Sequence, residues 1–240
     1  MINAVIGRIE IKLILLNNVC KTYKNKEIGL ENISLEINEG EFIFLVGQSG
    51  AGKSTLLKLI TGEEKPTSGE ICVFDLILNN LGRKELPYYR RLLGIIDSNL
   101  SLLDYKTVYQ NIELALIATE QTNKNINDSI NRVLGIVGMT KKMLDYPTEL
   151  SGGEKLKIQI ARALINNPKI ILADEPTASL DNDTAWDIMC LFNDLNKLGT
   201  TIIISTHAKE FVNIMKKRVV TINNGKILGD VNKGKYGWLK

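Results

Sequence analysis

Short apolar runs alternate along the chain with stretches in which apolar residues recur every three or four positions. The runs are rich in Ile, Leu, Val and Phe, and their length suits strands buried on both faces of a sheet. The stretches have helical spacing, and each ends at a glycine, where helices commonly stop. Strand, helix and strand in this order predict a parallel sheet with right-handed crossovers. The strands are expected at 41–46, 169–173 and 200–204, and the helices at 53–61 and 181–198.

The middle of the chain follows a different pattern. Between about 101 and 166 no run resembles a strand, whereas 107–118 and 129–137 have helical apolar spacing, so a mostly helical insertion is expected to interrupt the sheet. Near the end, two short apolar runs flank Asn224-Gly225, which predicts a β-hairpin.

Composition narrows the class of protein. The chain has 240 residues, of which 44% are hydrophobic, enough for a buried core in one domain. A net charge of +3 is too mild to favour nucleic acid as a partner. The three cysteines, Cys20, Cys72 and Cys190, form no C-x-x-C pair, so we expect neither a disulfide framework nor a zinc site, and a reducing cytosol is the simpler interpretation.

The chain is expected to lack a membrane span of its own. No apolar run approaches the roughly 18 residues that a spanning helix needs. The first ten residues lack the basic start and apolar stretch of a secretory signal. If the protein works at a membrane, we therefore expect another chain to supply the spanning part.

The first motif with chemical meaning is a glycine-rich segment that fits G-x-x-x-x-G-K-[ST]. It follows a predicted strand and opens a predicted helix, so backbone N–H groups and the helix N-terminus can hold phosphate oxygens. Lys53 is expected to reach the β- and γ-phosphates, and Ser54 to bind Mg²⁺. The expected phosphate-binding residues, including the threonine that follows the motif, are Gly47, Gln48, Ser49, Gly50, Ala51, Gly52, Lys53, Ser54 and Thr55.

Two further predicted strands are followed by residues that could take part in catalysis. The apolar run 170–173 leads into Asp174 and Glu175, at the edge where ligands of open α/β sheets gather. Asp174 is expected to bind Mg²⁺, and Glu175 to hold the attacking water and accept its proton. His207, the single histidine, follows the run 200–204 and is expected at the same edge. A lone histidine is usually structural, but its place in the order of motifs favours contact with the γ-phosphate.

A fourth motif is Leu150-Ser-Gly-Gly-Glu. Ser151 and Glu154 form an S-x-x-E capping box before a predicted helix at 156–164. Gly152 and Gly153 are poor residues for a first helical turn, which suggests that another group approaches the backbone closely. A helix N-terminus with bare N–H groups suits a phosphate.

With these motifs in this order, the chain resembles the ABC ATPase family over essentially its whole length. The resemblance implies a P-loop NTPase (RecA-like) α/β core with a parallel sheet, an N-terminal antiparallel β subdomain and an inserted helical subdomain. The expected layout is a single ATPase domain at 13–240, with core segments 13–97 and 165–240, a helical insertion at 98–164 and an extension at 1–12.

The family resemblance also assigns roles to single residues. Tyr23 matches the aromatic residue that stacks on adenine, Asp181 matches a dimer-contact loop, and His207 matches the switch histidine. It implies an ATP-dependent, head-to-tail homodimer in which the Ser151 loop of one copy closes over the phosphate loop of the other. One departure is clear: where the family has a Mg²⁺-contacting glutamine, this chain has Ser98, which is shorter and can bind only through water.

Within the family, three segments resemble the FtsE division ATPases, which act with the membrane protein FtsX. They are 86–91, 106–111 and the tail 225–238. This resemblance implies an FtsX-type integral membrane partner and a cytoplasmic location at the inner face of the plasma membrane. Two alternatives stay open: an ATPase of an exporter or lipoprotein-release system, and a slowly hydrolysing scaffold gated by nucleotide. A ribosome- or DNA-directed ABC protein is disfavoured, because those usually need two cassettes or a long coiled coil.

Overall fold

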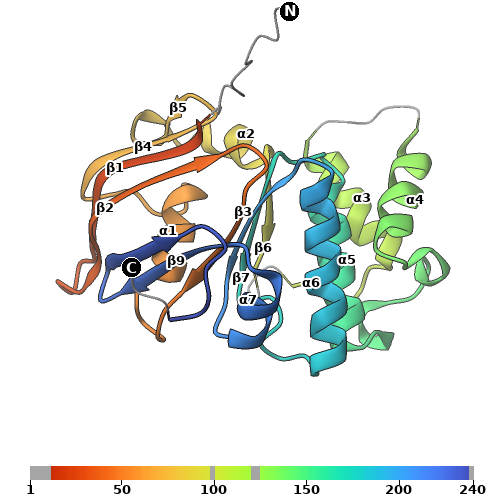
Figure 1. Ribbon diagram of the computed structural model, residues 1–240. Coiled ribbons are helices and arrows are strands. Elements are labelled where there is room, and N and C mark those ends of the chain that lie inside the picture. Colours follow the sequence, from red (N-terminus) through yellow and green to blue (C-terminus); the bar gives the residue numbers. More distant parts are fainter. Residues whose placement is uncertain (1–11, 98–100, 120–124, 238–240) are drawn as a thin grey trace, which may run out of the picture.

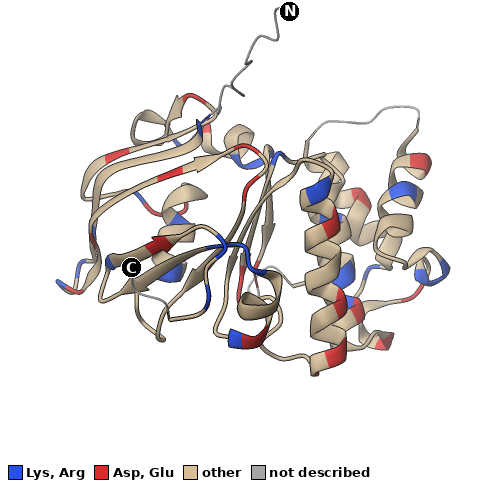
Figure 2. Ribbon diagram, viewed as in Figure 1, with Lys and Arg blue, Asp and Glu red and all other residues tan. Residues whose placement is uncertain are grey.

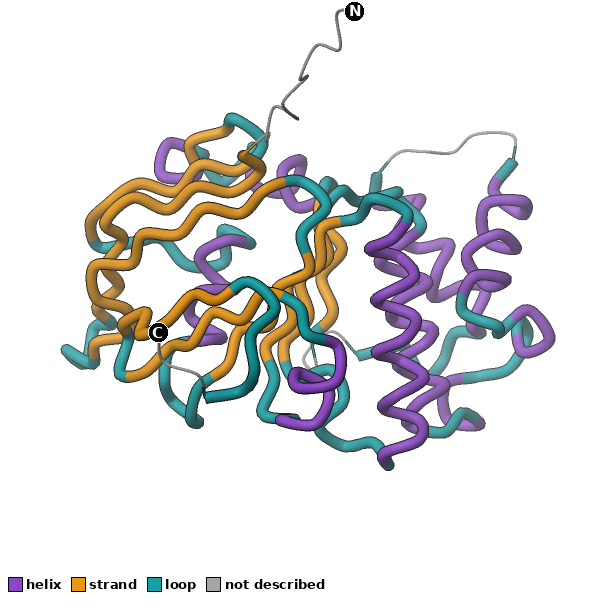
Figure 3. The backbone as a smooth tube through the Cα atoms, in the orientation of Figure 1, coloured by secondary structure: helices purple, strands orange, loops and turns teal. Residues whose placement is uncertain are grey.

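The computed structural model describes residues 12–97, 101–119 and 125–237. Ser98, the residue at the expected glutamine position, lies outside these ranges. Two sheets and a group of helices make up the described structure (Figures 1 and 3). None of its helices is long and apolar enough to cross a bilayer. Acidic and basic residues are interspersed along the elements, in keeping with the small net charge (Figure 2).

The first sheet is antiparallel and has the order β2-β1-β4-β5. Its long strands mix buried and exposed residues in an irregular alternation, as in a sheet with one face on a core. This sheet is the expected N-terminal antiparallel β subdomain. The strands are β1 (Lys12–Thr22), β2 (Ile28–Asn38), β4 (Ser68–Val73) and β5 (Leu76–Ile77).

The second sheet is mostly parallel and has the order β10-β9-β3-β8-β7-β6, with only the β9–β10 hairpin antiparallel. The three expected strands and the hairpin at Asn224-Gly225 are confirmed, with ends shifted by a residue or a few. The strands are β3 (Phe42–Val46), β6 (Leu93–Ile96), β7 (Ile170–Asp174), β8 (Thr201–Ser205), β9 (Arg218–Asn223) and β10 (Lys226–Val231).

Side chains of the parallel strands alternate between two hydrophobic cores. Ile43 and Leu45 of β3 pack with the antiparallel sheet and α1 (Lys53–Ile60), whereas Phe42, Phe44 and Val46 pack with the helices of the other face. Burial on both faces explains why these strands appear as continuous apolar runs. Their carboxyl ends therefore meet at one edge between the two cores.

Most of the other helices pack on the core that contains Phe44, whereas Tyr89, in the short helix before β6, is buried in the core that contains Ile43. In the described residues between 101 and 164 there are helices and turns but no strand, as expected. Gly62, with φ +66°, ends α1 as predicted. The helices are α2 (Leu86–Arg90), α3 (Val108–Ala118), α4 (Ile126–Ile136), α5 (Gly152–Leu164), α6 (Asn182–Lys197) and α7 (Lys209–Met215), with short 3₁₀ turns at Leu78–Asn80, Thr140–Lys142 and Pro147–Glu149.

Candidate functional site

The glycine-rich loop joins β3 to α1 and depends on glycine for its close backbone approaches. A Cβ on Gly47 (φ +153°) would lie 2.1 Å from the carbonyl oxygen of Ile222. A Cβ on Gly52 (φ +111°) would lie 2.6 Å from the carbonyl oxygen of Gly29. Gly52 is also the N-cap of α1 and provides no side-chain cap. The first N–H groups of α1 therefore remain available to an anion.

Lys53 lies inside this loop with only 5% of its surface exposed. Its Nζ donates to the carbonyl oxygens of Gly47 (3.0 Å) and Gln48 (3.2 Å). The same atom lies 3.0 Å from His207 Nε2 and 3.7 Å from Glu175 Oε1. Burial lowers the pKa of Lys53, and the negative charges of Glu175 and Asp174 oppose that change. A buried cation among backbone carbonyls and one carboxylate is placed to receive an anion.

The two acids at the end of β7 are held by Ser205, at the end of the neighbouring strand β8. Asp174 pairs with Ser205 in the sheet register, and the Ser205 hydroxyl donates to the Asp174 carboxylate. The backbone N–H of Glu175 donates to the same hydroxyl at 3.1 Å. Glu175 has φ +47°, an uncommon conformation for this residue type. Ser205 was not among the expected site residues, although a hydroxyl at the carboxyl end of a neighbouring strand could have indicated it.

His207 completes the cluster at this edge. Its backbone N–H donates to Glu175 Oε2 at 3.2 Å, and its Nε2 lies 3.1 Å from Glu175 Oε1. The three residues expected to carry the chemistry, Lys53, Glu175 and His207, thus lie in mutual contact although they come from three segments of the chain.

A cavity of about 240 Å³ opens over the loop and this cluster. Tyr23, from the end of β1, forms part of its wall, and its hydroxyl lies 3.1 Å from Thr55 Oγ1. The structure therefore brings the expected aromatic residue to the phosphate loop. The cavity is lined by Tyr23, Glu27, Ile28, Gly29, the loop residues 49–55, Glu175 and His207.

Ser54 and Asp174 share a second, much smaller cavity of about 30 Å³. That volume exceeds the roughly 10–15 Å³ that a single water requires, so a particle the size of one water or one bare ion fits. No group of three His, Cys, Asp or Glu side chains that could hold a metal occurs in the described ranges. Magnesium is commonly held by one or two carboxylates together with substrate phosphates, so a hydroxyl and a carboxylate suit it.

A third cavity, of about 230 Å³, separates the sheet edge from α5. Asp97, Asp174 and Glu175 line it from the sheet, and Lys155 and Gln159 line it from the helix. Gln159 was not among the expected site residues. It lies two helical turns beyond the glycines of the fourth motif, and only the packing of α5 against β6 directs it toward the acids.

The fourth motif lies apart from the phosphate loop. Ser151 caps α5 by accepting from Glu154 N–H at 3.3 Å, and Glu154 accepts from Ser151 N–H at 2.9 Å. The close approach to Gly153 comes from within the chain: a Cβ there would lie 2.2 Å from Thr184 Cγ2. A Cβ on Gly152 would meet only Leu180, at 3.4 Å.

Asp181 also caps a helix, because its side chain accepts from the backbone N–H of Thr184 at 2.9 Å at the start of α6. None of Ser151, Gly152, Gly153 and Asp181 lines the cavity over the phosphate loop. Gly152, however, lines the third cavity together with Asp174 and Glu175.

Comparisons with known proteins agree with this geometry. A family model described as ABC transporter matches residues 30–178, more than half of the chain. This chain belongs to the ABC transporter family. As expected from its motifs, it is an ATPase of that family.

Its relatives include cell division ATP-binding proteins. The FtsE protein of Bacillus subtilis is 42% identical over 94% of this chain and 99% of its own length. FtsE of Escherichia coli K12 is 36% identical over 91% and 99% of the two chains. The methionine import ATP-binding protein MetN of Carboxydothermus hydrogenoformans is 41% identical over 90% of this chain and 65% of its own length. The ATPase is thus FtsE-like in sequence.

Solved structures share the same fold. The ATP-binding cassette MJ0796, a dimer in a post-hydrolysis state bound to ADP and Pi, aligns with a TM-score of 0.83 at 34% identity, covering 93% of this chain and all of that one. The cassette cbiO1 of Clostridium perfringens aligns with a TM-score of 0.85 at 28% identity, covering 92% and 89% of the two chains. The expected P-loop NTPase fold is confirmed.

Proposed function

We propose that this ATPase binds Mg-ATP on the loop 47–55 and hydrolyses it to drive an FtsX-type membrane protein in cell division. The observation that carries the proposal is the cluster of Lys53, Glu175 and His207 beside an uncapped helix N-terminus. The triphosphate lies along the cavity, with its γ-phosphate replacing the contacts that Lys53 now makes with backbone carbonyls. Tyr23 is the platform for the base.

Hydrolysis uses the residues at the sheet edge. Glu175 holds the attacking water and accepts its proton, a role that suits a carboxylate fixed through its backbone by Ser205. His207 contacts the γ-phosphate and helps to orient the water. Ser54 and Asp174 hold Mg²⁺, which neutralises phosphate charge when it is bound.

Two copies complete each site. Ser151, Gly152 and Asp181 do not reach the phosphate-loop cavity of their own chain, yet the first two begin a helix whose N–H groups suit a phosphate. A head-to-tail homodimer places the Ser151 turn of one copy over the ATP of the other. The dimeric solved relative supports dimerisation as such.

The division role rests on the FtsE relatives, which match this chain and their own lengths almost completely. The partner is then an FtsX-type integral membrane protein, and the ATPase lies against the inner face of the plasma membrane in the cytoplasm. The test is co-purification of the chain with an FtsX-type protein and, separately, with an importer-type membrane subunit. Equal binding to both would contradict the division role and leave the import ATPase as the alternative.

The ATPase step is tested with two variants. Lys53→Ala is expected to lose Mg-ATP binding, because it removes the buried cation of the loop. Glu175→Gln is expected to bind Mg-ATP and to form a dimer but to hydrolyse at least about a hundredfold more slowly, since a positioned general base contributes that much or more. If the wild type releases phosphate no faster than Glu175→Gln in the presence of the membrane partner, a nucleotide-gated scaffold is the better description.

A further inference from the structure

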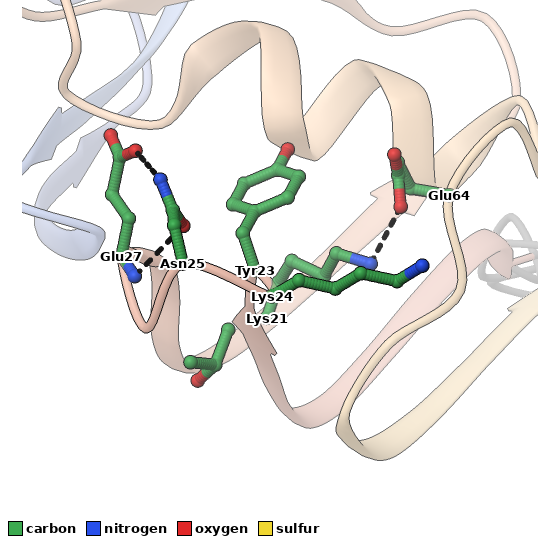
Figure 4. Close-up of a pocket in the computed structure, with 7 residues that line it drawn as sticks. Lys21, Tyr23, Lys24, Asn25, Glu27 and Glu64 are labelled. Carbon is green, nitrogen blue, oxygen red and sulfur yellow. Dashed lines mark hydrogen bonds and ion pairs between the residues drawn. The ribbon is translucent and has the colours of Figure 1, made fainter.

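A cavity of about 570 Å³ adjoins the cavity over the phosphate loop (Figure 4). The two share Tyr23 and Glu27 as wall residues, so the proposed base platform stands between them. The wall of the larger cavity contains many charged side chains for a site next to an aromatic ring. The lining residues are Lys21, Thr22, Tyr23, Lys24, Asn25, Glu27 and Glu64.

Lys21 is only 9% exposed, whereas Lys24, the other lysine of this wall, is exposed. Its Nζ donates to Glu64 Oε2 at 2.6 Å and to the carbonyl oxygen of Lys65 at 2.8 Å. The same Nζ lies over the Tyr23 ring, 5.2 Å from its centre. A cation within about 6 Å of a ring centre is attracted by the ring face. Two hydrogen bonds therefore hold an ammonium group against the platform.

Tyr23 is also held at its other end. Its hydroxyl lies 3.1 Å from Thr55 Oγ1, in the first turn of α1. Glu64, which holds Lys21, lies in the segment that follows the C-terminal end of the same helix. In Figure 4, Lys21 and Glu64 lie on one side of the Tyr23 ring, and Asn25 and Glu27 lie on the other. The Tyr23 ring is thus linked to α1 at two points: through Thr55 near the start of the helix, and through Lys21 and Glu64 beyond its end. The N-terminus of the same helix forms the phosphate-binding loop.

We propose that Lys21, held by Glu64, is a positioning residue that occupies one face of Tyr23 and leaves the opposite face for the nucleobase. The inference rests on the proposed function of Tyr23 as the base platform. The ion pair, buried at Lys21 and partly exposed at Glu64, sets the angle of the ring relative to α1, and hence the spacing between the base and the phosphates. The class of ligand is a nucleoside triphosphate whose base stacks on a single, preset ring face.

The experiment compares binding of Mg-ATP with binding of inorganic tripolyphosphate, which has no base, by calorimetry. Lys21→Met keeps the length of the side chain but removes its charge, and Lys21→Arg keeps the charge. Lys12→Met is the matched control, because Lys12 lies on the same strand and its ion pair with Glu36 is 54% exposed at both ends. Glu64→Gln removes the charge that pairs with Lys21 but leaves the Lys21 side chain in place.

Lys21→Met is expected to weaken Mg-ATP binding about three- to tenfold, which lies within the roughly two- to thirtyfold range that cation–π contacts span from exposed to desolvated sites. Tripolyphosphate binding is expected to stay unchanged, Lys21→Arg to recover most of the loss, and Lys12→Met to bind as the wild type does. Glu64→Gln is expected to show a smaller loss with the same selectivity, and it decides the question if Lys21→Met does not fold.

Two results would overturn the inference: unchanged Mg-ATP affinity in both Lys21→Met and Glu64→Gln, or equal losses for Mg-ATP and tripolyphosphate. Failure of the proposed function looks different. In that case the wild type itself binds no Mg-ATP, or Tyr23→Ala binds it as tightly as the wild type.

Discussion

Ser205→Ala is the substitution that most directly tests how the acidic edge is built. The Ser205 side chain is fully buried, donates to the Asp174 carboxylate and accepts from Glu175 N–H. Alanine removes both bonds at once. The backbone bond from Glu175 N–H to the carbonyl oxygen of Ser205, at 3.2 Å, survives, so the main loss is the bond to the charged Asp174.

A hydrogen bond to a charged group contributes about 1.5–3 kcal/mol, so we expect Ser205→Ala to lower the free energy of unfolding by about 2 kcal/mol. For a domain of this size that corresponds to a fall in Tm of roughly 4–8 °C. Glu175 also loses one of the two bonds that hold its backbone N–H. We therefore expect kcat to fall about tenfold, a fraction of what a positioned general base contributes, with little change in ATP affinity.

Thr221→Val is the matched control for this substitution. Thr221 lies on β9 of the same sheet, and its buried hydroxyl has no hydrogen-bond partner among the described residues. Replacing it with an isosteric apolar side chain is expected to be neutral or to stabilise by up to about 1 kcal/mol. Thermal unfolding and steady-state ATPase assays measure both variants. If Ser205→Ala and Thr221→Val have the same Tm and the same kcat, Ser205 does not organise the two acids.

Two further predictions concern the start of α5. Gly153→Ala places a Cβ 2.2 Å from Thr184 Cγ2 and is expected to cost about 1–3 kcal/mol of stability in thermal unfolding. Thr184→Ser, which removes that methyl group, is expected to restore it in the double variant, and additive losses would argue against the contact. The hydrogen bond from Lys142, aided by Ser151, holds the pKa of Glu154 at about 2. Since a lowered carboxyl pKa stabilises the fold above the ordinary value of 4.5, that contribution is lost as pH falls from 4.5 toward 2, and Glu154→Gln is expected to flatten the stability profile there.

Much of the fold could be predicted because its signals are local. Burial on both faces produces continuous apolar runs, and these located β3, β7 and β8 to within a residue or two. The strands of the antiparallel sheet were expected only as a subdomain, since β1 and β2 alternate irregularly and their register shifts at several bulges. Strand β6 has four residues and short helix α7 has seven, too few for a periodic signal.

The phosphate loop could be recognised from the sequence alone, because its chemistry lies in nine consecutive residues whose glycines the backbone requires. The same is true of the two acids and the histidine, which follow strands that end at one edge. The folded chain was needed to show that Ser205 bridges Asp174 and Glu175. It was also needed to show that Lys21 contacts Glu64 and the Tyr23 ring. Those contacts join segments that are distant along the chain. Strand order and helix packing set them, and neither is encoded in the spacing of residues within one segment.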